Sequence, residues 1–265
     1  MKLPGDTLAM EKMPGHWVLA RLGKRVLRPG GRMLTRQMLG ALAIGSEDRV
    51  VEFAPGLGST ARLTLRRQPA AYTAVEREQA AAERLRARFQ GSPFQCQTGT
   101  AEATGLPECS ATVVYGEAML TMQTPETKRR IVREAARLLQ PGGRYGMHEL
   151  CLMPDDLPAA LKQAIQNDLT QAIHVGARPL TPAEWRALLE DEGFAVQAER
   201  TAPMHLLEPA RLLADEGLSG AMRFAWNAMR EPKARKRVIE MRGVFRKYAP
   251  HLGAVMMVGA RTERP

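Results

Sequence analysis

The chain has 265 residues, of which 45% are apolar, 25% charged and 5% aromatic. This apolar fraction is typical of a globular protein that buries a core, and it excludes disorder as the main state. No stretch approaches the roughly 18 consecutive apolar residues of a membrane span, and residues 1–15 lack the apolar core of a signal peptide. We therefore expect a soluble, cytoplasmic protein.

The charge balance is strongly basic. The 38 Lys and Arg residues outnumber the 28 Asp and Glu residues and give a net charge of +10. Such an excess is compatible with a nucleic acid partner, because basic side chains neutralise phosphates. Most of the basic residues are arginines dispersed along helical patterns, which is more typical of a solvated surface. The one dense block is Lys233 to Arg237, and we do not expect nucleic acid as the main partner.

The three cysteines are Cys96, Cys109 and Cys151. Their odd number and the absence of a C-x-x-C spacing indicate neither a disulfide framework nor a cysteine zinc site. We expect free thiols and no metal centre.

Apolar runs alternate with helical patterns along the chain. The predicted strands are 50–54, 71–76, 94–97, 112–115, 144–149, 194–199 and 254–260. The predicted helices are 16–27, 33–43, 59–67, 79–89, 126–139 and 182–193, followed by a helical stretch at 208–248. Strands that alternate with helices predict an α/β fold in which a parallel sheet is covered on both faces.

Several helix boundaries carry clear signals. Thr124 is a predicted N-cap with Pro125 at the first helical position, and Thr181 opens a predicted capping box with Glu184. The Pro-Gly-Gly sequence at 141–143 is predicted to end a helix. The similar Pro-Gly-Gly at 29–31 is predicted to end one as well.

A glycine-rich turn follows the first predicted strand, in the sequence Glu52-Phe53-Ala54-Pro55-Gly56-Leu57-Gly58. Glycines let the backbone approach a ligand closely, and the amides at the start of the next helix can hold an anionic group. Glu76 ends the second strand, where an acid can accept hydrogen bonds from ribose hydroxyls. These residues predict an adenosine-containing ligand. Gly56, Gly58 and Ala61 also fit the dinucleotide fingerprint, which leaves a dehydrogenase open at this point.

The segment from Val50 to Glu149 resembles the class I S-adenosylmethionine-dependent methyltransferases of the small-molecule type. Glu52, Gly56 and Gly58 match the first motif of that family, and Ala54 stands where its first glycine would be. Further similar segments follow in the family's order, at 99–107, 110–115, 136–144 and 180–196. A dehydrogenase does not account for these later segments.

The resemblance implies a fold, a cofactor and a reaction. The fold would be a doubly wound, mostly parallel seven-stranded sheet of the Rossmann-like methyltransferase type. Residues 46–265 would form the methyltransferase domain with a helical insertion at about 203–250, and residues 1–45 would form a helical lid. The cofactor would be S-adenosyl-L-methionine, whose methyl group passes directly and in line to an unidentified small-molecule acceptor.

The resemblance also assigns cofactor contacts. The loop at 52–58 would cradle the methionine part of the cofactor, with Glu52 reaching its ammonium group, and Glu76 would bind the ribose. Thr100 and Ala101 would flank the adenine, with Glu102 as a substitute for the Asp that the family usually has at Thr100. Some small-molecule methyltransferases carry a Pro-Gly-Gly turn and a Thr ahead of the first strand, close to the cofactor carboxylate. The full predicted set is Glu52, Ala54, Pro55, Gly56, Gly58, Glu76, Arg77, Thr100, Ala101, Glu102, Gly116, Gly30, Gly31 and Thr35.

Catalytic residues are harder to predict, because a sulfonium leaving group needs no acid and the protein mainly positions the nucleophile. Glu117, after the fourth strand, and His148, at the end of the fifth, are candidates for a general base.

We expect two helical segments to cover a small acceptor that is anionic or partly apolar. One holds His16 and Trp17, and the other holds Met222, Phe224, Trp226 and Met229. Methionine and aromatic residues at such a spacing are more often part of the hydrophobic core, which is the alternative interpretation. The fourth strand lacks the D/N-P-P-Y/F/W pattern of many enzymes that methylate nucleobase or glutamine amines. Two alternatives remain open: an RNA-modifying methyltransferase that uses the block at 233–237, and a non-catalytic S-adenosylmethionine-binding sensor or scaffold.

Overall fold

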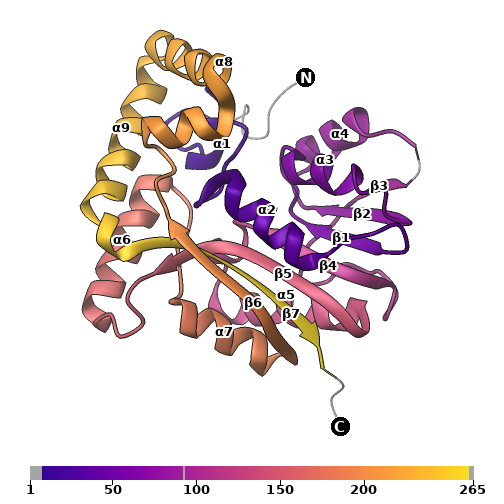
Figure 1. Cartoon of the computed structure of the whole chain (residues 1–265). Helices are drawn as coiled ribbons and strands as arrows, with labels where there is room; N and C mark the ends of the chain where they lie inside the picture. The colour runs from indigo at the N-terminus through magenta and orange to yellow at the C-terminus, as the bar shows by residue number, and fades with distance from the viewer. Residues whose placement is uncertain (1–7, 92, 263–265) are drawn as a thin grey trace.

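The computed structural model describes residues 8–91 and 93–262, and its centre is one twisted sheet with helices on both faces (Figure 1). The strands are β1 (Arg49–Phe53), β2 (Ala71–Glu76), β3 (Phe94–Thr98), β4 (Ala111–Glu117), β5 (Leu139–Leu152), β6 (Phe194–Pro203) and β7 (Leu252–Arg261). Their order across the sheet is β3-β2-β1-β4-β5-β7-β6, and β7 runs antiparallel to the other six strands. The predicted doubly wound, mostly parallel seven-stranded sheet is confirmed.

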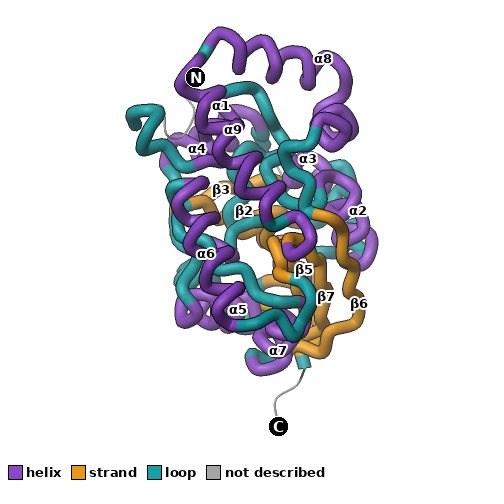
Figure 2. Tube along the Cα trace, turned by 90° about the vertical axis from the view of Figure 1, so that its left-hand side faces the viewer, coloured by secondary structure: helices purple, strands orange, loops and turns teal. Residues whose placement is uncertain are grey.

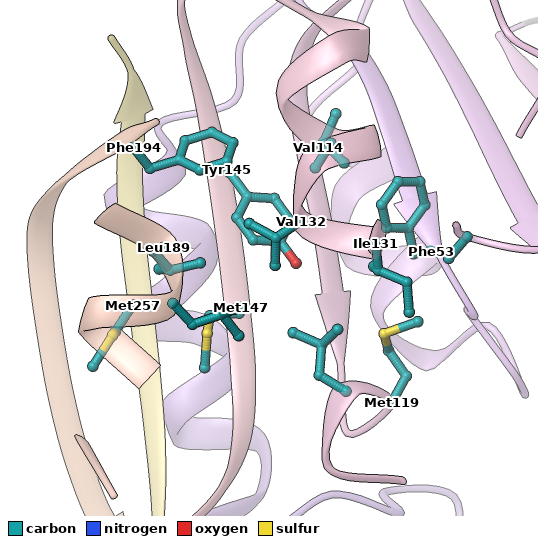
Figure 3. Close-up of a cluster of buried hydrophobic side chains, with 14 of the residues drawn as sticks. Phe53, Val114, Met119, Ile131, Val132, Tyr145, Met147, Leu189, Phe194 and Met257 are labelled. Atoms are coloured by element: carbon teal, nitrogen blue, oxygen red, sulfur yellow. The ribbon is translucent and has the colours of Figure 1, made fainter. Parts of the chain in front are cut away.

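The helices of the described residues are α1 (Gly15–Arg21), α2 (Gly31–Leu42), α3 (Ser59–Leu65), α4 (Gln79–Arg88), α5 (Pro125–Leu138), α6 (Ala159–Ile173), α7 (Pro182–Asp191), α8 (Pro209–Arg230) and α9 (Pro232–Lys247). Seven of them fall into three groups around the sheet, which are α5 with α7, α2 with α3, and α1 with α6 and α9. One group, α5 and α7, packs on one sheet face. Figure 3 shows Val132 and Leu189 of these helices near Tyr145 and Phe194 of the strands, and Ile131 near Phe53. All six side chains are buried and belong to one cluster of the core.

The second group covers the opposite face. Leu34, Met38, Leu39 and Leu42 of α2 are fully buried against strand residues such as Met256. The third group, α1, α6 and α9, lies together beyond the sheet, as Figure 2 also shows, and shares an apolar cluster with the late part of β5. Of the first 45 residues, therefore, α1 joins this outer cluster and α2 packs on the sheet. The division of the chain at residue 45 stays a prediction.

The predicted helix caps are found. The Thr124 side chain accepts the backbone N–H of Thr127 at 3.2 Å at the start of α5. At the start of α7, Thr181 and Glu184 form the capping box in both directions. These short polar signals act within one turn of chain, which is why the sequence predicts them well.

Some predictions about the helices are wrong. The Pro-Gly-Gly at 29–31 begins α2 instead of ending a helix, because Gly30 is its N-cap with φ +70°, and α1 already ends at Arg21. The stretch at 208–248 is two helices, which meet where Pro232 opens α9. The helix α6 was not predicted.

The expectation for the exposed face of α8 is also wrong. Met222, Trp226 and Met229 are more than half exposed, so they neither belong to the core nor cover a cavity, whereas Phe224 is buried. Among the described residues, no helix combines the length and the apolar character needed to cross a membrane.

Candidate active site

A cavity of about 420 Å³ opens at the carboxyl ends of β1, β2 and β4. Its volume falls within the roughly 300–1,000 Å³ of small-molecule sites. Nine of the predicted cofactor residues line it: Glu52, Ala54, Pro55, Gly56, Glu76, Arg77, Thr100, Ala101 and Glu102. Parallel strands end at one edge of the sheet, and this brings together motifs that are up to 50 residues apart in the chain.

Glu76 is held by backbone amides at the end of β2. Its Oε2 accepts the N–H of Gly56 at 2.9 Å, and its Oε1 accepts the N–H of Glu78 at 3.0 Å. The residue is only 4% exposed, and burial raises the pKa of its carboxyl although these amides oppose the shift. The two bonds fix the carboxylate at the cavity wall, and each oxygen keeps a lone pair for a further donor.

Glu52 is a second buried acid of the cavity. It is 3% exposed and accepts hydrogen bonds from the hydroxyls of Tyr115, at 2.6 Å, and Tyr72. Burial raises the pKa of Glu52 to about 7, and the two tyrosine hydroxyls only partly oppose this. Tyr115 is the neighbour of Glu52 in the register of β1 and β4, so the sheet itself sets this contact.

The residue that follows β1 and the residue that follows β4 both have a left-handed backbone conformation. Ala54, after β1, has φ +49°, and Ala118, after β4, has φ +52°. Ala54 stands where the resembled motif has glycine, the residue that adopts such a φ at least cost. Ala54 thus adopts the backbone conformation that glycine adopts most easily, although it replaces the glycine of the resembled motif.

Glu117, at the end of β4, lies in a set of four polar partners. Its carboxylate pairs with Arg28 Nη1 at 3.0 Å and accepts from Thr35 Oγ1 at 2.6 Å and from Thr60 Oγ1. The fourth partner is His148 Nδ1 at 2.8 Å. Burial alone would raise the pKa of Glu117, but Arg28 and His148 outweigh it and lower that pKa to about 2.

His148 is fully buried on β5. Its Nε2 donates to the carbonyl oxygen of Pro29 at 2.7 Å, and its Nδ1 faces the Glu117 carboxylate. An ionised carboxylate only accepts hydrogen bonds, so Nδ1 is also a donor here. Neither ring nitrogen is free to accept a proton in this arrangement, and His148 is not among the residues that line the cavity.

Glu149, next to His148, supports the loop after β4. Its carboxylate accepts the backbone N–H groups of Met119, Leu120 and Thr121 at 2.8 to 3.0 Å. Burial raises the pKa of Glu149, and these bonds partly oppose the shift. The acid thus fixes a segment that contributes Met119 and Thr121 to the cavity wall.

Five predicted cofactor residues lie outside the cavity lining: Gly30, Gly31, Thr35, Gly58 and Gly116. An added Cβ would lie 2.5 Å from Asp215 at Gly31 and 2.9 Å from Ala254 at Gly30. At Gly58 it would lie 2.7 Å from Leu85. These glycines allow close packing, and a direct cofactor contact by any of the five stays a prediction.

The sequence did not single out Arg28, which lines the cavity beside the Pro-Gly-Gly turn. The residue is 9% exposed, and its Nε has no hydrogen-bond partner among the described residues. A buried unpaired donor of this kind is costly unless a ligand satisfies it. Its nearness to Glu117 depends on contacts between distant segments, which no local pattern reports.

His16 also lines the cavity, on α1. Burial, with a smaller effect of the Arg77 charge, lowers the pKa of His16 to about 4, so its imidazole is neutral at pH 7. The ring lies 4.6 Å from the ring of Trp17, a further residue of the cavity wall.

The far wall of the cavity is apolar. It is formed by Leu169 and Ile173 of α6, Met241 and Phe245 of α9, and Met204 after β6. His16 and Trp17 lie in the cavity wall as the sequence predicted. The second predicted cover was placed on α8 instead of on α6 and α9, because α6 was not predicted and α9 was not separated from α8.

The basic block at 233–237 is partly neutralised within the chain. Lys233 pairs with Glu11 at 2.8 Å. Arg237 is 5% exposed and donates to the carbonyl oxygens of Met10, Met13 and Ala172. The most buried charge of the block thus anchors the segment before α1.

Comparisons with known proteins agree with this site. Residues 51–147 match the family model described as a methyltransferase domain. An uncharacterized protein of Haemophilus influenzae is 31% identical over 220 residues, which cover 82% of this chain and 86% of that protein. The chain belongs to the class I S-adenosylmethionine-dependent methyltransferases.

Solved structures share the methyltransferase fold at low sequence identity. The [4+2]-cyclase SpnF is 14% identical with a TM-score of 0.69, and the match covers 92% of this chain and 93% of that chain. Phosphoethanolamine N-methyltransferase 2 of Haemonchus contortus, in complex with S-adenosylhomocysteine, is 12% identical with a TM-score of 0.71. That match covers 94% of this methyltransferase and 57% of the other chain. Use of S-adenosylmethionine follows for this chain from its family.

Proposed function

We propose that this methyltransferase binds S-adenosylmethionine in the cavity at the ends of β1, β2 and β4 and methylates a small acceptor with an apolar body. The observation that carries the proposal is the composition of that one cavity. Motif acids and the glycine-rich loop line one side, and apolar side chains of α6 and α9 line the other.

The residues fit the parts of the cofactor. Glu76 offers two anchored carboxylate oxygens to the ribose hydroxyls, and Glu52 offers a buried acid to the ammonium group. A Cβ at Gly56 would have no atom within 4 Å, so the loop leaves open space there. The unpaired Nε of Arg28 is a donor for the carboxylate of the methionine part. When bound, the cofactor supplies the electrophilic methyl group.

The far wall selects the acceptor. Leu169, Ile173, Met241 and Phe245 present apolar atoms, and methionines adapt to ligands of varied shape. With cofactor and acceptor bound, the same wall would limit the access of water and help to position the acceptor for methyl transfer.

The hydrogen bonds of Glu117 and His148 favour a positioning role for both. A carboxyl with a pKa of about 2 is a weak base at neutral pH, and both nitrogens of His148 already donate. Together they hold Arg28 at the cavity wall. For an acceptor that must lose a proton, the group in the cavity wall that is free of a proton at pH 7 is His16, although its pKa of about 4 makes it a weak base.

Calorimetric titration with S-adenosylhomocysteine tests cofactor binding. Glu76→Ala should weaken the affinity at least tenfold, because two anchored acceptors are lost. Glu83→Ala is the matched control, since Glu83 is an exposed acid of α4 outside the cavity lining. Equal affinity of all three proteins would overturn the ribose assignment.

Methyl transfer needs a separate test, because SpnF, which has a similar fold, is named as a cyclase. Wild type and Glu76→Ala would be assayed for S-adenosylhomocysteine release over a panel of small apolar acceptors. Release by wild type alone supports the proposal. Tight cofactor binding without turnover on any acceptor would favour the sensor alternative, and turnover on RNA with a steep salt dependence would favour the RNA alternative.

A further inference from the structure

A second cleft, of about 570 Å³, lies on the other side of the glycine-rich loop. It is formed by the segment before α2, by α3 and α4, and by residues 215–216 of α8, which can be located in Figure 1. Six arginines line it: Arg25, Arg28, Arg32, Arg62, Arg84 and Arg88. We call it the arginine cleft.

The two acids of the arginine cleft are already engaged. Glu216 Oε1 accepts the backbone N–H groups of Arg25 and Val26, each at 2.8 Å. Asp215 Oδ1 accepts the backbone N–H of Arg32 at 3.0 Å. Both carboxylates also lie 3.8 Å from the buried Lys24 ammonium. The two carboxylates therefore interact with main-chain amides and with Lys24, and they form no ion pair with the guanidinium groups of the cleft.

Four of the arginines have no counter-charge. Arg28 pairs with Glu117, and Arg32 Nη1 donates to the backbone carbonyl oxygen of Asp215 at 3.2 Å. Within residues 8–91 and 93–262 no carboxylate forms an ion pair with the other four, which are Arg25, Arg62, Arg84 and Arg88. These guanidinium groups come from three separate parts of the chain. Burial, followed by the charges of Arg62, Arg25 and Arg84, lowers the pKa of Arg88. Like charges are thus close enough to repel one another.

One of these arginines is already fixed. Arg88 Nη1 donates to the carbonyl oxygen of Leu57 in the glycine-rich loop at 2.9 Å. A planar guanidinium group binds phosphate oxygens with two parallel hydrogen bonds, so a fixed arginine is well suited to them. Charges crowded in a concave site also attract anions, because the low-dielectric walls focus the field.

We propose that the arginine cleft binds a compact polyanion, a pyrophosphate-type group on a small molecule. A single phosphate would neutralise only part of four uncompensated guanidinium groups, whereas a pyrophosphate carries several charges within a few ångströms. None of the described residues that line the cleft is aromatic, so a nucleic acid strand would find no stacking surface among them. The volume of the cleft lies within the range of small-molecule sites, which also favours a small ligand.

The arginine cleft shares a wall with the cofactor cavity. Arg25, Arg28, Leu57 and Ser59 line both, and Ser59 Oγ donates to the carbonyl oxygen of Arg25 at 3.0 Å. A pyrophosphate group here has two sources. It is a free molecule that modulates the neighbouring site, or it is one end of the methyl acceptor, and the second source rests on the proposed function.

Calorimetric titration of the full chain with inorganic pyrophosphate at low salt tests the site. The double variant Arg62→Gln/Arg84→Gln should bind pyrophosphate at least tenfold more weakly than wild type. The control is Arg36→Gln/Arg66→Gln, which changes net charge equally through two exposed arginines outside the cleft. It should bind within about twofold of wild type.

Several outcomes would overturn the proposal. Wild type that binds no pyrophosphate, or a control variant weakened as much as the cleft variant, would show no specific site. A short RNA that binds more tightly than pyrophosphate and depends on Arg62 and Arg84 would replace the small-molecule ligand by nucleic acid. Thermal unfolding of each variant checks that all of them fold.

Two further titrations distinguish a free pyrophosphate ligand from a diphosphate group of the methyl acceptor. They also test the arginine cleft separately from the proposed function. An alkyl diphosphate should bind more tightly than pyrophosphate and lose this gain in Phe245→Ala if the group belongs to the acceptor, whereas equal binding indicates a free ligand. Both results support the cleft. S-adenosylhomocysteine is titrated in parallel, so pyrophosphate binding without cofactor binding would overturn the proposed function and leave the cleft intact.

Discussion

Nδ1 of His148 lies 2.8 Å from Oε1 of Glu117, and Nε2 of the same ring lies 2.7 Å from the carbonyl oxygen of Pro29. The imidazole of this residue of β5 thus contacts both β4 and the turn before α2. Glu117 precedes His148 by 31 residues in the chain, and Pro29 precedes it by 119. The acid that it contacts also pairs with Arg28 at the cavity wall. The cofactor cavity is therefore supported by a buried network of charges.

Glu117→Gln should destabilise the protein. The change leaves the buried guanidinium of Arg28 without its counter-charge, and removing one partner of a buried pair costs roughly 3–5 kcal/mol. Urea unfolding measures the loss. Arg28→Met in the same background should recover part of it, and equal stability of wild type and Glu117→Gln would contradict the account.

This stabilisation should depend on pH. The folded pKa of Glu117, about 2, lies below its ordinary value of 4.5, so the contribution is present above pH 4.5 and is lost as the pH falls toward 2. The difference in unfolding free energy between wild type and Glu117→Gln should therefore shrink over that interval. A difference that stays constant would mean that Glu117 stabilises the protein by packing alone.

Ionisation of Glu52 should have the opposite effect on stability, so that the protein becomes less stable as the pH rises. Its folded pKa of about 7 lies above the ordinary 4.5, so between these values the folded state keeps a proton that the unfolded state has lost. Stability therefore falls as pH rises through this window, by up to roughly 3 kcal/mol for a shift of this size. Glu52→Gln, which resembles the protonated acid, should be more stable than wild type at pH 8 and similar to it at pH 4, as measured by urea unfolding.

Cofactor binding should release a proton near pH 7. If the ammonium group of the cofactor lies beside Glu52, its charge favours the ionised carboxylate and lowers the pKa. Titration with S-adenosylhomocysteine in two buffers of different ionisation enthalpy measures the proton count. Glu52→Gln should abolish the release, and an unchanged count in that variant would place the ammonium elsewhere.

Ala54→Gly should be neutral or stabilising by up to about 1 kcal/mol. A left-handed φ costs a non-glycine residue about 1–2 kcal/mol, and the greater freedom of glycine in the unfolded chain offsets part of the gain. Ala80→Gly, in the ordinary helical backbone of α4, is the control and should destabilise by about 1 kcal/mol. Thermal unfolding would contradict the assigned strain if both changes had the same sign.

The sequence predicted what depends on short segments. Strands, caps and the position of Glu76 all follow from patterns within a few residues, and the structure places Glu76 at the cavity wall. Local signals are insufficient where they mark the boundary of a helix but do not show whether the helix begins or ends there. The Pro-Gly-Gly turn at 29–31 begins a helix because Gly30 takes a left-handed φ that the sequence permits but does not specify.

Residues that act through distant contacts were missed for a different reason. Arg28 owes its place to Glu117, which is 89 residues later in the chain, and the arginine cleft combines four separate segments. Each of its arginines taken alone has the pattern of a solvated helix face. Only the folded chain shows that several of them lack a counter-charge.

The burial of α2 has a practical consequence for dissecting this protein. A fragment that started at residue 46 would uncover the sheet face under Leu34, Met38, Leu39 and Leu42, and it would take Arg28 and Thr35 away from Glu117. We expect such a fragment to aggregate when produced alone, since apolar surface and an unpaired acid would become exposed together. The smallest portion that could refold on its own should therefore extend upstream of Arg28.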